Sequence, residues 1–417
     1  MPNCETTEEF LPATATELAR WVGENDAGPA RPLYPAGGRT AIEFGYPSPQ
    51  SGIRVSTTEL KKVIDYPARD MTITVEAGIR ISELAEILAT EKQRLAVDVA
   101  LPRRATLGGV VAANASGPRR FGWGTIRDYV LGVSAVDASG RLYKAGGRVV
   151  KNVAGYDLCK MLVGSYGSLA IITQVTLKVR PIPESSGILW CAFDHLASIE
   201  QALARLTSSA TRPIAVDLLD ARAAAEIAAT ADLDLPTHRP VLCVGVEGTG
   251  HETAWQLEQL RSEIGPFQPN SMTVVAADDV GDVWTALTEF QVASDDPLTF
   301  KASLLPSRTV EFLQMAEAAG CSIQAHAANG IVIGHLPDTV SSASAAEALL
   351  RPLRELTTRC QGNLAIEQCD EAWKAALPLL GEPPQAAKWM RTLKRQLDPR
   401  NLLNPGRLGK DLSPAVT

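Results

Sequence analysis

The 417-residue sequence lacks the features that mark several common classes of protein. Its seven cysteines are scattered and contain no C-x-x-C pair, so neither an iron–sulfur cluster nor a zinc site is expected. No apolar run approaches the roughly 18 residues that span a bilayer, and the N-terminal MPNCETTEEF has no apolar stretch of the kind found in signal peptides. A cytoplasmic protein with reduced thiols and no direct membrane span is therefore expected, and a partner would make any attachment to the inner membrane.

Aromatic residues are also scarce, at 5% of the chain. Proteins that bind nucleic acid combine a basic stripe with stacking aromatics, so no nucleic-acid partner is expected. The net charge of −7 is unevenly distributed, because residues 1–182 carry 22 basic and 18 acidic side chains while residues 183–417 carry 18 and 29. The basic first half indicates an anionic ligand in that half.

The pattern of apolar residues predicts an α+β fold with two domains and a C-terminal tail. Pro181 and Pro183 end the alternating pattern of the first half, and the second half interleaves strands and helices as in an antiparallel sheet covered on one face. In the first half and the tail, strands are expected at 31–35, 71–75, 130–146 and 169–179, and helices at 14–25, 56–66, after a cap at Ser82, and at 371–398. The expected domains are 1–182, 183–370 and 371–417.

Three segments of the first half are rich in glycine and other small residues. PAGGRT (35–40) follows a predicted strand and offers successive N–H groups that can hold a pyrophosphate, although it has neither the P-loop Lys-Ser/Thr nor the G-x-G-x-x-G spacing. ATLGGVVAANASG (105–117) lies between two prolines and two Arg-Arg pairs. GSYGSLAIITQVTLKV (164–179) places a glycine turn before a strand whose main chain near Ile171 and Ile172 can contact an adenine edge.

Each segment also has a purely structural alternative: the first is a tight turn, and the second is a closely packed Ala/Gly helix. The bracketing prolines and flanking arginines count against that helix. Between Leu101 and Gly132 there are five arginines and no carboxylate before Asp128. Small residues let a backbone lie flat against a large planar ligand, and unbalanced arginines favour an anionic one. Together, the segments predict a bound dinucleotide such as FAD.

In this order the three segments resemble the FAD-binding domain of the vanillyl-alcohol oxidase / p-cresol methylhydroxylase superfamily. RRFGWGTIRDYVLG (119–132), KNVAGYDLCKMLVGSYGSLAIITQVTLKVRP (151–181) and LKRQLDPRNLLNPGRL (393–408) also resemble the FAD-binding E subunits of bacterial glycolate oxidases. The resemblance implies two α+β subdomains that hold FAD, an α+β cap domain with an antiparallel sheet over the isoalloxazine ring, and a C-terminal tail that returns to the flavin. Some relatives attach the flavin through a histidine at the position of Arg39. Arginine cannot form that bond, so the FAD is expected to be non-covalent.

These segments and the resemblance together give a set of expected FAD contacts. Backbone N–H groups of the first segment, small side chains of the second and main-chain groups of the third supply them. The residues are Pro35, Ala36, Gly37, Gly38, Arg39, Thr40, Gly78, Pro102, Ala105, Thr106, Leu107, Gly108, Gly109, Ala113, Asn114, Ser116, Gly117, Gly122, Gly167, Ile171, Ile172 and Asn404.

Oxidation of a 2-hydroxy acid requires a cation for the carboxylate and a base for the hydroxyl proton. Arg119 and Arg120 are candidate anchors, because a guanidinium meets a carboxylate at two points; pairing with acidic groups of a partner or of the cap domain is the alternative. His326 is a candidate base and Tyr156 a candidate donor to a substrate oxygen, and a structural role is the alternative for both. Metal-dependent relatives carry an H-x-G-D-G-N-x-H-like signature, whereas this chain reads HAANG from His326, so no metal is expected.

The function implied by the resemblance is that of the FAD-binding subunit of a glycolate oxidase or dehydrogenase complex, which converts glycolate to glyoxylate. The expected partners are a homologous FAD-containing subunit, an iron–sulfur subunit and a small 2-hydroxy acid substrate. Two alternatives stay open. One is a self-sufficient FAD-linked dehydrogenase of the D-lactate type, and the other is a flavin-free scaffold subunit.

Overall fold

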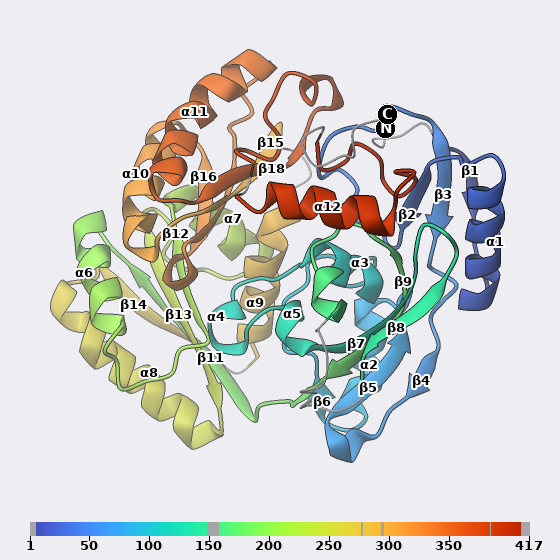
Figure 1. Cartoon of the computed structure of the whole chain (residues 1–417). Helices are drawn as coiled ribbons and strands as arrows, with labels where there is room; N and C mark the ends of the chain where they lie inside the picture. The colour runs from blue at the N-terminus through green and yellow to red at the C-terminus, as the bar shows by residue number, and fades with distance from the viewer. Residues whose placement is uncertain (1–5, 148–157, 277, 293–295, 384, 410–417) are drawn as a thin grey trace. The chain divides into compact units, whose positions relative to one another are not determined.

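The structure is a computed structural model that describes residues 6–147, 158–276, 278–292, 296–383 and 385–409 (Figure 1). The chain divides into two compact units, each built from separate stretches of sequence. The first unit contains residues up to 116, 125–182 and 383 onward, and the second contains 117–124 and 183–382. Residues 117–124, expected in the FAD-binding domain, and 371–382, expected in the tail, therefore belong to the second unit.

The first unit begins with a three-stranded parallel sheet. Its order is β1 (Thr6–Phe10), β3 (Gly52–Ser56) and β2 (Leu33–Ala36). Helix α1 (Ala15–Ala27) starts after Thr14, whose hydroxyl accepts a hydrogen bond of 3.1 Å from the N–H of Glu17. The helix buries Leu18 and Val22 in a core that also contains Val136 and Leu403, so residues from distant parts of the chain share one apolar cluster.

A five-stranded antiparallel sheet forms the rest of this unit's framework. Its order is β4 (Val63–Asp65), β5 (Thr72–Glu76), β9 (Ile171–Lys178), β7 (Val130–Val136) and β8 (Leu142–Gly146). The unit also contains α2 (Ile81–Ala89), α3 (Leu107–Ala113), α5 (Ile126–Tyr129), α12 (Ala387–Leu397) and a two-stranded pair of β6 (Gln93–Arg94) with β10 (Arg180–Pro181). Because Ile171 of β9 joins the core around α1, the two larger sheets pack on the same apolar cluster.

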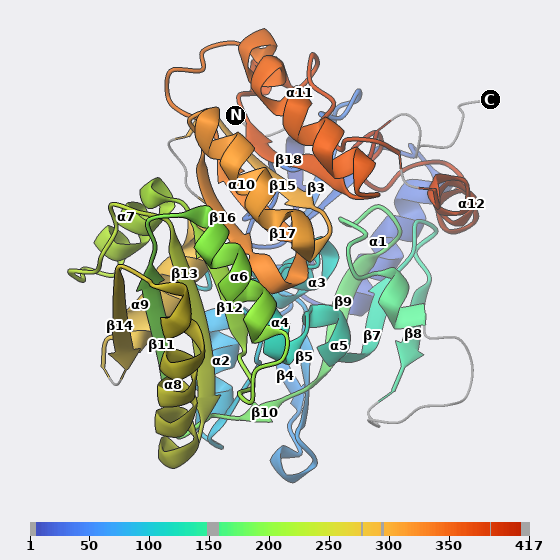
Figure 2. The ribbon, with the colours of Figure 1, turned by 90° about the vertical axis from the view of Figure 1, so that its left-hand side faces the viewer.

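The second unit is an eight-stranded antiparallel sheet with helices. The strand order is β14 (Ser271–Ala276), β11 (Ser185–Ala192), β13 (Val241–Gly248), β12 (Ala215–Leu219), β16 (Ser322–His326), β17 (Ile331–His335), β15 (Leu298–Ser303) and β18 (Asn363–Cys369). The helices are α4 (Arg120–Trp123), α6 (Leu196–Leu206), α7 (Ala221–Thr230), α8 (Gly250–Ile264), α9 (Val280–Glu289), α10 (Thr309–Ala318) and α11 (Ala343–Arg359). Figure 2 shows α6, α8, α10 and α11 along one side of this sheet.

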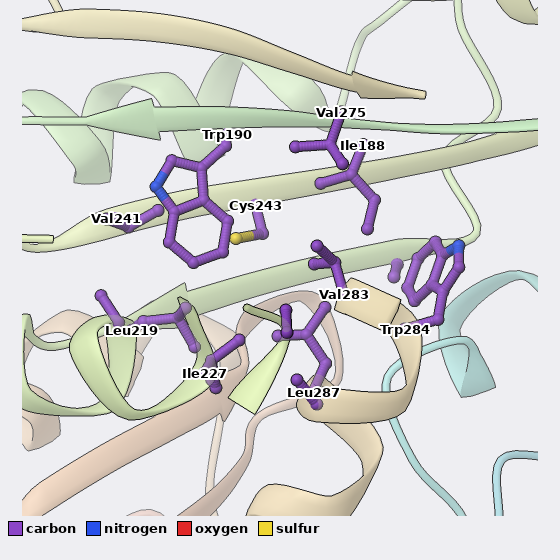
Figure 3. Packing of buried hydrophobic residues seen from close by; sticks show 14 of the residues in the cluster. Ile188, Trp190, Leu219, Ile227, Val241, Cys243, Val275, Val283, Trp284 and Leu287 are labelled. Atoms are coloured by element: carbon purple, nitrogen blue, oxygen red, sulfur yellow. The ribbon is translucent and has the colours of Figure 1, made fainter. Parts of the chain in front are cut away.

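Helices cover both faces of the sheet at β11. A Cβ on Gly187 would lie 2.8 Å from Leu257 of α8, whereas the alternate residues Ile188 and Trp190 belong to a core with Val283 of α9. Figure 3 shows the strand residues of that core pointing toward the residues of α7 and α9. The expectation of cover on one face is therefore wrong. The alanine-rich α7 and the unpredicted α9 form the second layer.

Residues 56–66 are not helical, contrary to the prediction. They cross to β4, which pairs with β5, and the N–H of Glu76 donates to the carbonyl of Lys62 at 2.9 Å. Residues 56–66 have a local helical pattern, but the pairing of β4 with β5, which follows it in sequence, decides their conformation. Helix α2 also starts earlier than expected, after Arg80 rather than at Ser82.

Only part of 371–398 is helical. Residues Glu371–Trp373 form a single 3₁₀ turn, and α12 begins only at Ala387. Pro378 and Pro383 lack the N–H that a helix needs, and Gly381 has a left-handed φ of 67°. These residues break the predicted long helix into a turn, a loop and a short helix.

Candidate functional site

The loop at residues 37–40 follows β2 and packs closely against the start of the second small-residue segment. A Cβ on Gly37 would overlap the hydroxyl of Thr106, and a Cβ on Gly38 would overlap the carbonyl of Arg104. Only glycine fits this approach. Although Gly38 and Thr106 are 68 residues apart in sequence, the N–H of Gly38 lies 3.3 Å from the hydroxyl oxygen of Thr106. The first two predicted segments therefore meet in the first unit.

This loop also has backbone N–H groups that can bind an anion. Within the described ranges, the N–H groups of Gly37, Arg39 and Thr40 donate no hydrogen bond. Arg39 has a left-handed φ of 60°, and alternating conformations of this kind turn successive N–H groups toward one side. These amides match the chemistry that a diphosphate needs.

Two arginines place positive charge beside the loop. Arg103 and Arg104 are exposed, and in the part of the chain that the structure describes neither forms an ion pair. The side chain of Arg39, in contrast, pairs with Glu9, whose other carboxylate oxygen lies 3.9 Å from Arg54. The amide of Arg39, rather than its guanidinium, is thus the group available at the loop.

The second small-residue segment contains a helix, α3, so the helical alternative is correct for residues 107–113. Its first turn is held by a neighbouring turn of the chain, because the N–H groups of Leu107 and Gly108 donate to the carbonyls of Ile79 and Ala77 at 2.9 and 2.7 Å. The two prolines that bracket the segment lie outside the helix. They therefore do not prevent it.

Helix α3 has one buried face and one face of small residues. Leu107, Gly108, Val110 and Val111 are buried, whereas Gly109 is exposed and Ala113 half-buried. Asn114 ends the helix with a left-handed φ of 53° and is exposed. A surface with so little side-chain bulk fits the predicted shelf for a planar ring.

Four other expected FAD contacts have packing roles around this helix. A Cβ on Gly78 would overlap the carbonyl of Thr57. Pro102 and Ala105 accept hydrogen bonds of 3.0 Å from the chain entering α2, and Ser116 is buried. These positions fix the segment in place.

The third segment and the C-terminal tail meet at the same place. The N–H groups of Gly164 and Tyr166 donate to carbonyls near the end of α3 at 3.1 and 2.9 Å. A Cβ on Gly167 (φ 68°) would lie 3.0 Å from the side-chain nitrogen of Asn404 and 3.3 Å from the Cβ of Pro35. The side chain of Asn404 donates to the carbonyl of Tyr166 at 2.7 Å. All three predicted segments and the tail thus converge within the first unit.

A buried lysine ties the tail to this convergence. Lys394 of α12 donates to the carbonyls of Ser168 and Leu403, each at 2.8 Å, and pairs with the fully buried Asp398. Burial lowers the pKa of Lys394, and the carboxylate of Asp398 opposes that shift. Leu33 of β2 then accepts the backbone N–H of Asn404 at 2.9 Å, so the tail lies beside the strand that leads into the 37–40 loop.

Arg407 makes a second tie between the tail and the loops. Its guanidinium lies 5.6 Å from the centroid of the Tyr166 ring, which stacks on Phe44 at 4.2 Å. Its Nη2 donates to the carbonyl of Ala41 at 2.6 Å. Burial lowers the pKa of Arg407, and the neighbouring Tyr166 and Glu43 oppose that shift. The tail therefore fixes both ends of the glycine-rich surface.

The predicted adenine contacts lie at the start of β9. Ile171 and Ile172 pair with Val136 and Ala135 of β7 on one side. On the other side β5 pairs only as far as Glu76 with Gln174. At this end of β9, Ile171 and Ile172 have no partner in β5. The contact with adenine stays a prediction.

Arg119 and Arg120 lie in the second unit, where Arg119 has an acidic partner. Its Nη1 is 3.1 Å from Glu247, a carboxylate with 2% of its side chain exposed, which also accepts the indole N–H of Trp123 at 2.9 Å. The guanidinium lies 5.1 Å from the ring of Trp284. These contacts favour the alternative considered for Arg119, pairing with an acidic group of the cap domain.

Two expected FAD contacts, Gly117 and Gly122, also lie in the second unit. A Cβ on Gly122 would lie 2.7 Å from the Cα of Ile214, to whose carbonyl its N–H donates at 2.9 Å. Gly117 accepts the N–H of Arg120 at 3.1 Å. These contacts explain why the 117–124 segment belongs with the cap sheet.

His326, the candidate base, is buried in the second unit beside a carboxylate. It sits opposite Asp217 across the β12–β16 pair, with Nδ1 3.0 Å from a carboxylate oxygen. Gln324 donates to the same carboxylate at 2.7 Å. A histidine held by a carboxylate is the usual arrangement of an oriented base. No pattern near His326 in the sequence indicates Asp217, which lies 109 residues away.

His335, on the neighbouring strand, has the contacts of a structural histidine. Burial lowers its pKa to about 4, although its hydrogen bond to the carbonyl of Phe290 opposes the shift. It is therefore neutral at pH 7. Nε2–H donates to the carbonyl of Phe290 at 2.8 Å, and Nδ1 lies 3.0 Å from the hydroxyl of Thr299 and 3.2 Å from the carboxylate of Asp296. The remaining catalytic candidate, Tyr156, lies outside the described residues.

Two features of the described ranges bear on the expected metal content and membrane span. Across these ranges, no group of three or more His, Cys, Asp or Glu side chains is placed to hold a metal ion. In the same part of the chain, no helix is long and apolar enough to cross a bilayer. Both findings apply only to those residues.

Known proteins match this chain over most of its length. The D subunit of glycolate oxidase, GlcD, from Bacillus subtilis is 24% identical over 406 residues, covering 90% of this chain and 83% of that protein. The mitochondrial D-lactate dehydrogenase [cytochrome] of Arabidopsis thaliana is 27% identical over 395 residues, covering 90% and 69%. The GlcE subunit of glycolate oxidase from Escherichia coli is 32% identical over 155 residues, covering 37% and 43%.

The fold and the family follow from three further matches. A structure of p-cresol methylhydroxylase with substrate bound superposes with a TM-score of 0.73 and 15% identity, covering 97% of this chain and 88% of that one, which confirms the predicted α+β fold. Residues 10–146 match the FAD binding domain family, and residues 182–408 match the family of FAD linked oxidases, C-terminal domain. The chain belongs to the FAD-linked oxidases, oxidoreductases that use FAD as cofactor.

Proposed function

We propose that this chain is the FAD-binding subunit of a glycolate oxidase-type complex that converts glycolate to glyoxylate. The FAD is bound non-covalently, and electrons leave this chain for partner subunits. Similarity to both GlcD and GlcE of glycolate oxidase supports a role in such a complex. The other similar proteins include a D-lactate dehydrogenase, so a small 2-hydroxy acid is the class of substrate.

The observation that carries the proposal is the meeting of the three small-residue segments and the tail in one unit. Contacts between sequence-distant parts of the chain make this meeting. Gly38 packs against Arg104, Gly167 packs against Pro35, and the side chain of Asn404 bonds to the third segment. A scaffold subunit without flavin has no need for N–H groups that bind nothing in the protein. The convergence therefore favours a flavin-binding subunit over a scaffold.

The residues of the first unit fit FAD in three ways. The amides of Gly37, Arg39 and Thr40 would hold the diphosphate, with Arg103 and Arg104 supplying positive charge. The small-residue face of α3 would support the ring system. Bound FAD supplies the acceptor for the two electrons and the hydrogen that leave the substrate carbon.

Residues of the second unit would handle the substrate's charge and proton. Arg120, the other predicted anchor, would bind the carboxylate through two N–H groups of its guanidinium. Asp217 orients His326, whose ring would take the hydroxyl proton as the electrons leave. Replacing Asp217 with Asn would leave His326 without its orienting charge. We expect the rate of substrate oxidation to fall more than the affinity for glycolate.

A second candidate function is that of a self-sufficient dehydrogenase of a 2-hydroxy acid. The match to a D-lactate dehydrogenase over 90% of this chain favours it. The shared-complex version is preferred, because residues 326–330 depart from the tail-side signature of the metal-dependent dehydrogenases. The two versions differ in whether this chain alone oxidises substrate.

An absorbance spectrum of the purified chain tests the proposal. The purified chain should absorb at about 370 and 450 nm, as oxidised flavin does. Acid precipitation should release all of the flavin into the supernatant, because it is not covalently bound. Loss of the longer-wavelength band on adding glycolate to the chain alone would favour the self-sufficient enzyme. Loss of that band only after the partner subunits are added would favour the complex. A colourless chain that takes up no added FAD would rule out both.

A further inference from the structure

Helix α12 (Ala387–Leu397) has one anchored face and one exposed face. The anchored face carries Ala387 and Lys394, and the buried charge pair of Lys394 with Asp398 fixes the helix to the first unit. On the opposite side Trp389 is 74% exposed, and Met390, nearer the anchored face, is 38% exposed. Trp389 has the largest exposed fraction among the exposed large apolar residues of the described chain. Figure 2 looks along the axis of this helix.

The exposed face combines a tryptophan with two cationic side chains on one side of the helix. Lys388, Thr392 and Arg395 are exposed and follow one another at i, i+4 and i+7, which places them on one side of the helix. Trp389 projects about 100° further round, in line with the geometry of 3.6 residues per turn. Tryptophan and arginine are the side chains most enriched at the energetic centres of protein interfaces.

The charge of this face is opposite to that of the chain as a whole. From Pro383 to Leu397 the sequence contains no Asp or Glu, while the whole chain has a net charge of −7. Lys394 is neutralised by Asp398, but Lys388 and Arg395 form no ion pair among the described residues. The exposed face is therefore locally cationic and fits an acidic surface.

We propose that this face, defined by Lys388, Trp389, Thr392 and Arg395, docks on an acidic surface of another polypeptide. Trp389 enters an apolar recess of that partner, and the two cations lie against its carboxylates. The partner is a different subunit of the oxidase complex, and only this choice of partner rests on the proposed function. Because the Lys394 anchor already holds the helix in place, little ordering is needed on docking.

The other occupants of such a face fit less well. A helix that lies on a membrane needs a wide apolar face, whereas this one offers a single large apolar side chain, with Met390 toward its edge. A second copy that met this face with its own, across a twofold axis, would place Lys388 and Arg395 opposite the same cations. An acidic partner of a different sequence avoids both problems.

The experiment coexpresses the full-length chain with the GlcD-type flavoprotein subunit of its own organism, the homologous partner that the proposed function expects. Sedimentation of the purified mixture gives the dissociation constant of the heteromer. Trp389→Ala should raise this constant tenfold or more, as expected for removal of a hot-spot tryptophan. Trp255→Ala is the matched control, because Trp255 lies on α8 and is 54% exposed. It should leave the constant unchanged.

A charge-reversal pair tests the cations separately. Lys388→Glu with Arg395→Glu should weaken the heteromer at about 50 mM salt and have less effect at about 500 mM, where surface charges are screened. Lys61→Glu with Lys62→Glu makes the same change of charge at two exposed lysines elsewhere in the first unit and should have no effect.

Three results would overturn the docking proposal. In the first, the wild-type chain forms no heteromer. In the second, Trp389→Ala leaves the dissociation constant of the heteromer unchanged. In the third, Trp389→Ala weakens only a homodimer, or only binding to phosphatidylglycerol vesicles. The flavin spectrum of the chain separates this proposal from the proposed function. A colourless chain that still forms the heteromer through Trp389 would contradict the proposed flavin-binding function and support the docking proposal.

Discussion

The two units use glycine for different purposes. In the first unit, glycines let main chain approach main chain: a Cβ on Gly38 or Gly78 would overlap a backbone carbonyl. In the strands of the second unit, glycines make room for large side chains. A Cβ on Gly245 would overlap the ring of Trp284, and one on Gly334 would overlap the ring of Phe300. Close approach of main chain thus shapes the small-residue loops of the first unit, and side-chain packing shapes the strands of the second.

The buried polar groups differ in the same way. Lys394 in the first unit is a charged group held by two backbone carbonyls and Asp398. His335 in the second unit is neutral at pH 7 and fits between side chains and one carbonyl. Substitutions at the loop glycines of the first unit should therefore disturb loop placement and flavin binding, whereas substitutions at the strand glycines of the second unit should disturb stability.

Gly38→Ala should have the largest effect. The new methyl group has no space beside the carbonyl of Arg104, so the 37–40 loop must move away from α3. We expect the flavin content of the purified protein to fall at least tenfold, measured as absorbance near about 450 nm. Gly147→Ala is the control, because no atom lies within 4 Å of the added Cβ. Equal flavin content in the two variants would contradict the role of the loop.

Lys394→Met should be next. It leaves the buried Asp398 carboxylate without its cation, and loss of one partner of a buried pair lowers the free energy of unfolding by about 3–5 kcal/mol. Urea unfolding followed by tryptophan fluorescence measures the change. Lys388→Met removes an exposed lysine from the same helix and should change stability by less than about 0.5 kcal/mol. Similar losses in both variants would show that the Lys394 network does not stabilise the tail.

His335 should make the stability depend on pH. Its pKa is about 4 in the folded chain and 6.5 ordinarily, so the unfolded chain binds the proton more readily. Stability is then lost as the pH falls from about 6.5 to about 4, by about 3 kcal/mol at 1.36 kcal/mol per unit. Asp220, whose pKa burial raises to about 6, acts in the opposite direction, so the slope of the wild type alone is not informative.

The difference between the wild type and His335→Asn isolates this histidine. The variant should lack the loss at low pH, and His251→Asn, which alters an exposed histidine, should keep it. Guanidinium unfolding midpoints between about pH 7 and pH 4.5 give the comparison, because titration of the histidine falls within that window. Parallel pH curves for all three proteins would mean that His335 is not a buried neutral base.

Gly245→Ala should lower stability by about 1–3 kcal/mol through overpacking against Trp284, without loss of flavin. The double variant with Trp284→Phe should recover part of this loss. Gly250→Ala, at a position with no neighbour within 4 Å, is the control in the same unit. Loss of flavin in Gly245→Ala would break the distinction between the two units.

Arg39→Ala should have the smallest effect. The side chain pairs with Glu9 at the surface, and an exposed pair contributes about 0–1 kcal/mol. The backbone amide that would face the diphosphate is retained, so the flavin content should stay within about twofold of the wild type, as expected for an amide contact. A colourless Arg39→Ala variant would mean that the guanidinium, rather than the amide, holds the cofactor.

Local patterns in the sequence predicted local elements. The alternation at 71–75 and 169–179 became β5 and β9, and the helix at 14–25 became α1, because each depends on its own periodicity. The helix predicted at 56–66 failed because pairing with β5 decides that segment. The glycines of the site were identified, but the atoms that they approach were not, since those lie far away in sequence.

The partners of the catalytic candidates were likewise hidden. Nothing near His326 indicates Asp217, because only the register of β12 with β16 brings them together. Nothing near Arg119 indicates Glu247, and no pattern marks Lys394 among the exposed cations of its helix. Long-range pairing of charged residues therefore limits what the sequence predicts about this site.

The interrupted construction of the first unit bears on how the protein is made by the ribosome. Strand β2 is bonded to residues 402–404, and the whole second-unit stretch 183–382 is synthesised between the two. At about 5–20 residues per second, the roughly 370 residues that separate Leu33 from Leu402 take about 20–70 s to synthesise. During that delay β2 lacks the residues 402–404 to which it is bonded in the folded chain. Chaperone contact with the nascent N-terminal part is expected, and the cofactor can be taken up only after translation is nearly finished.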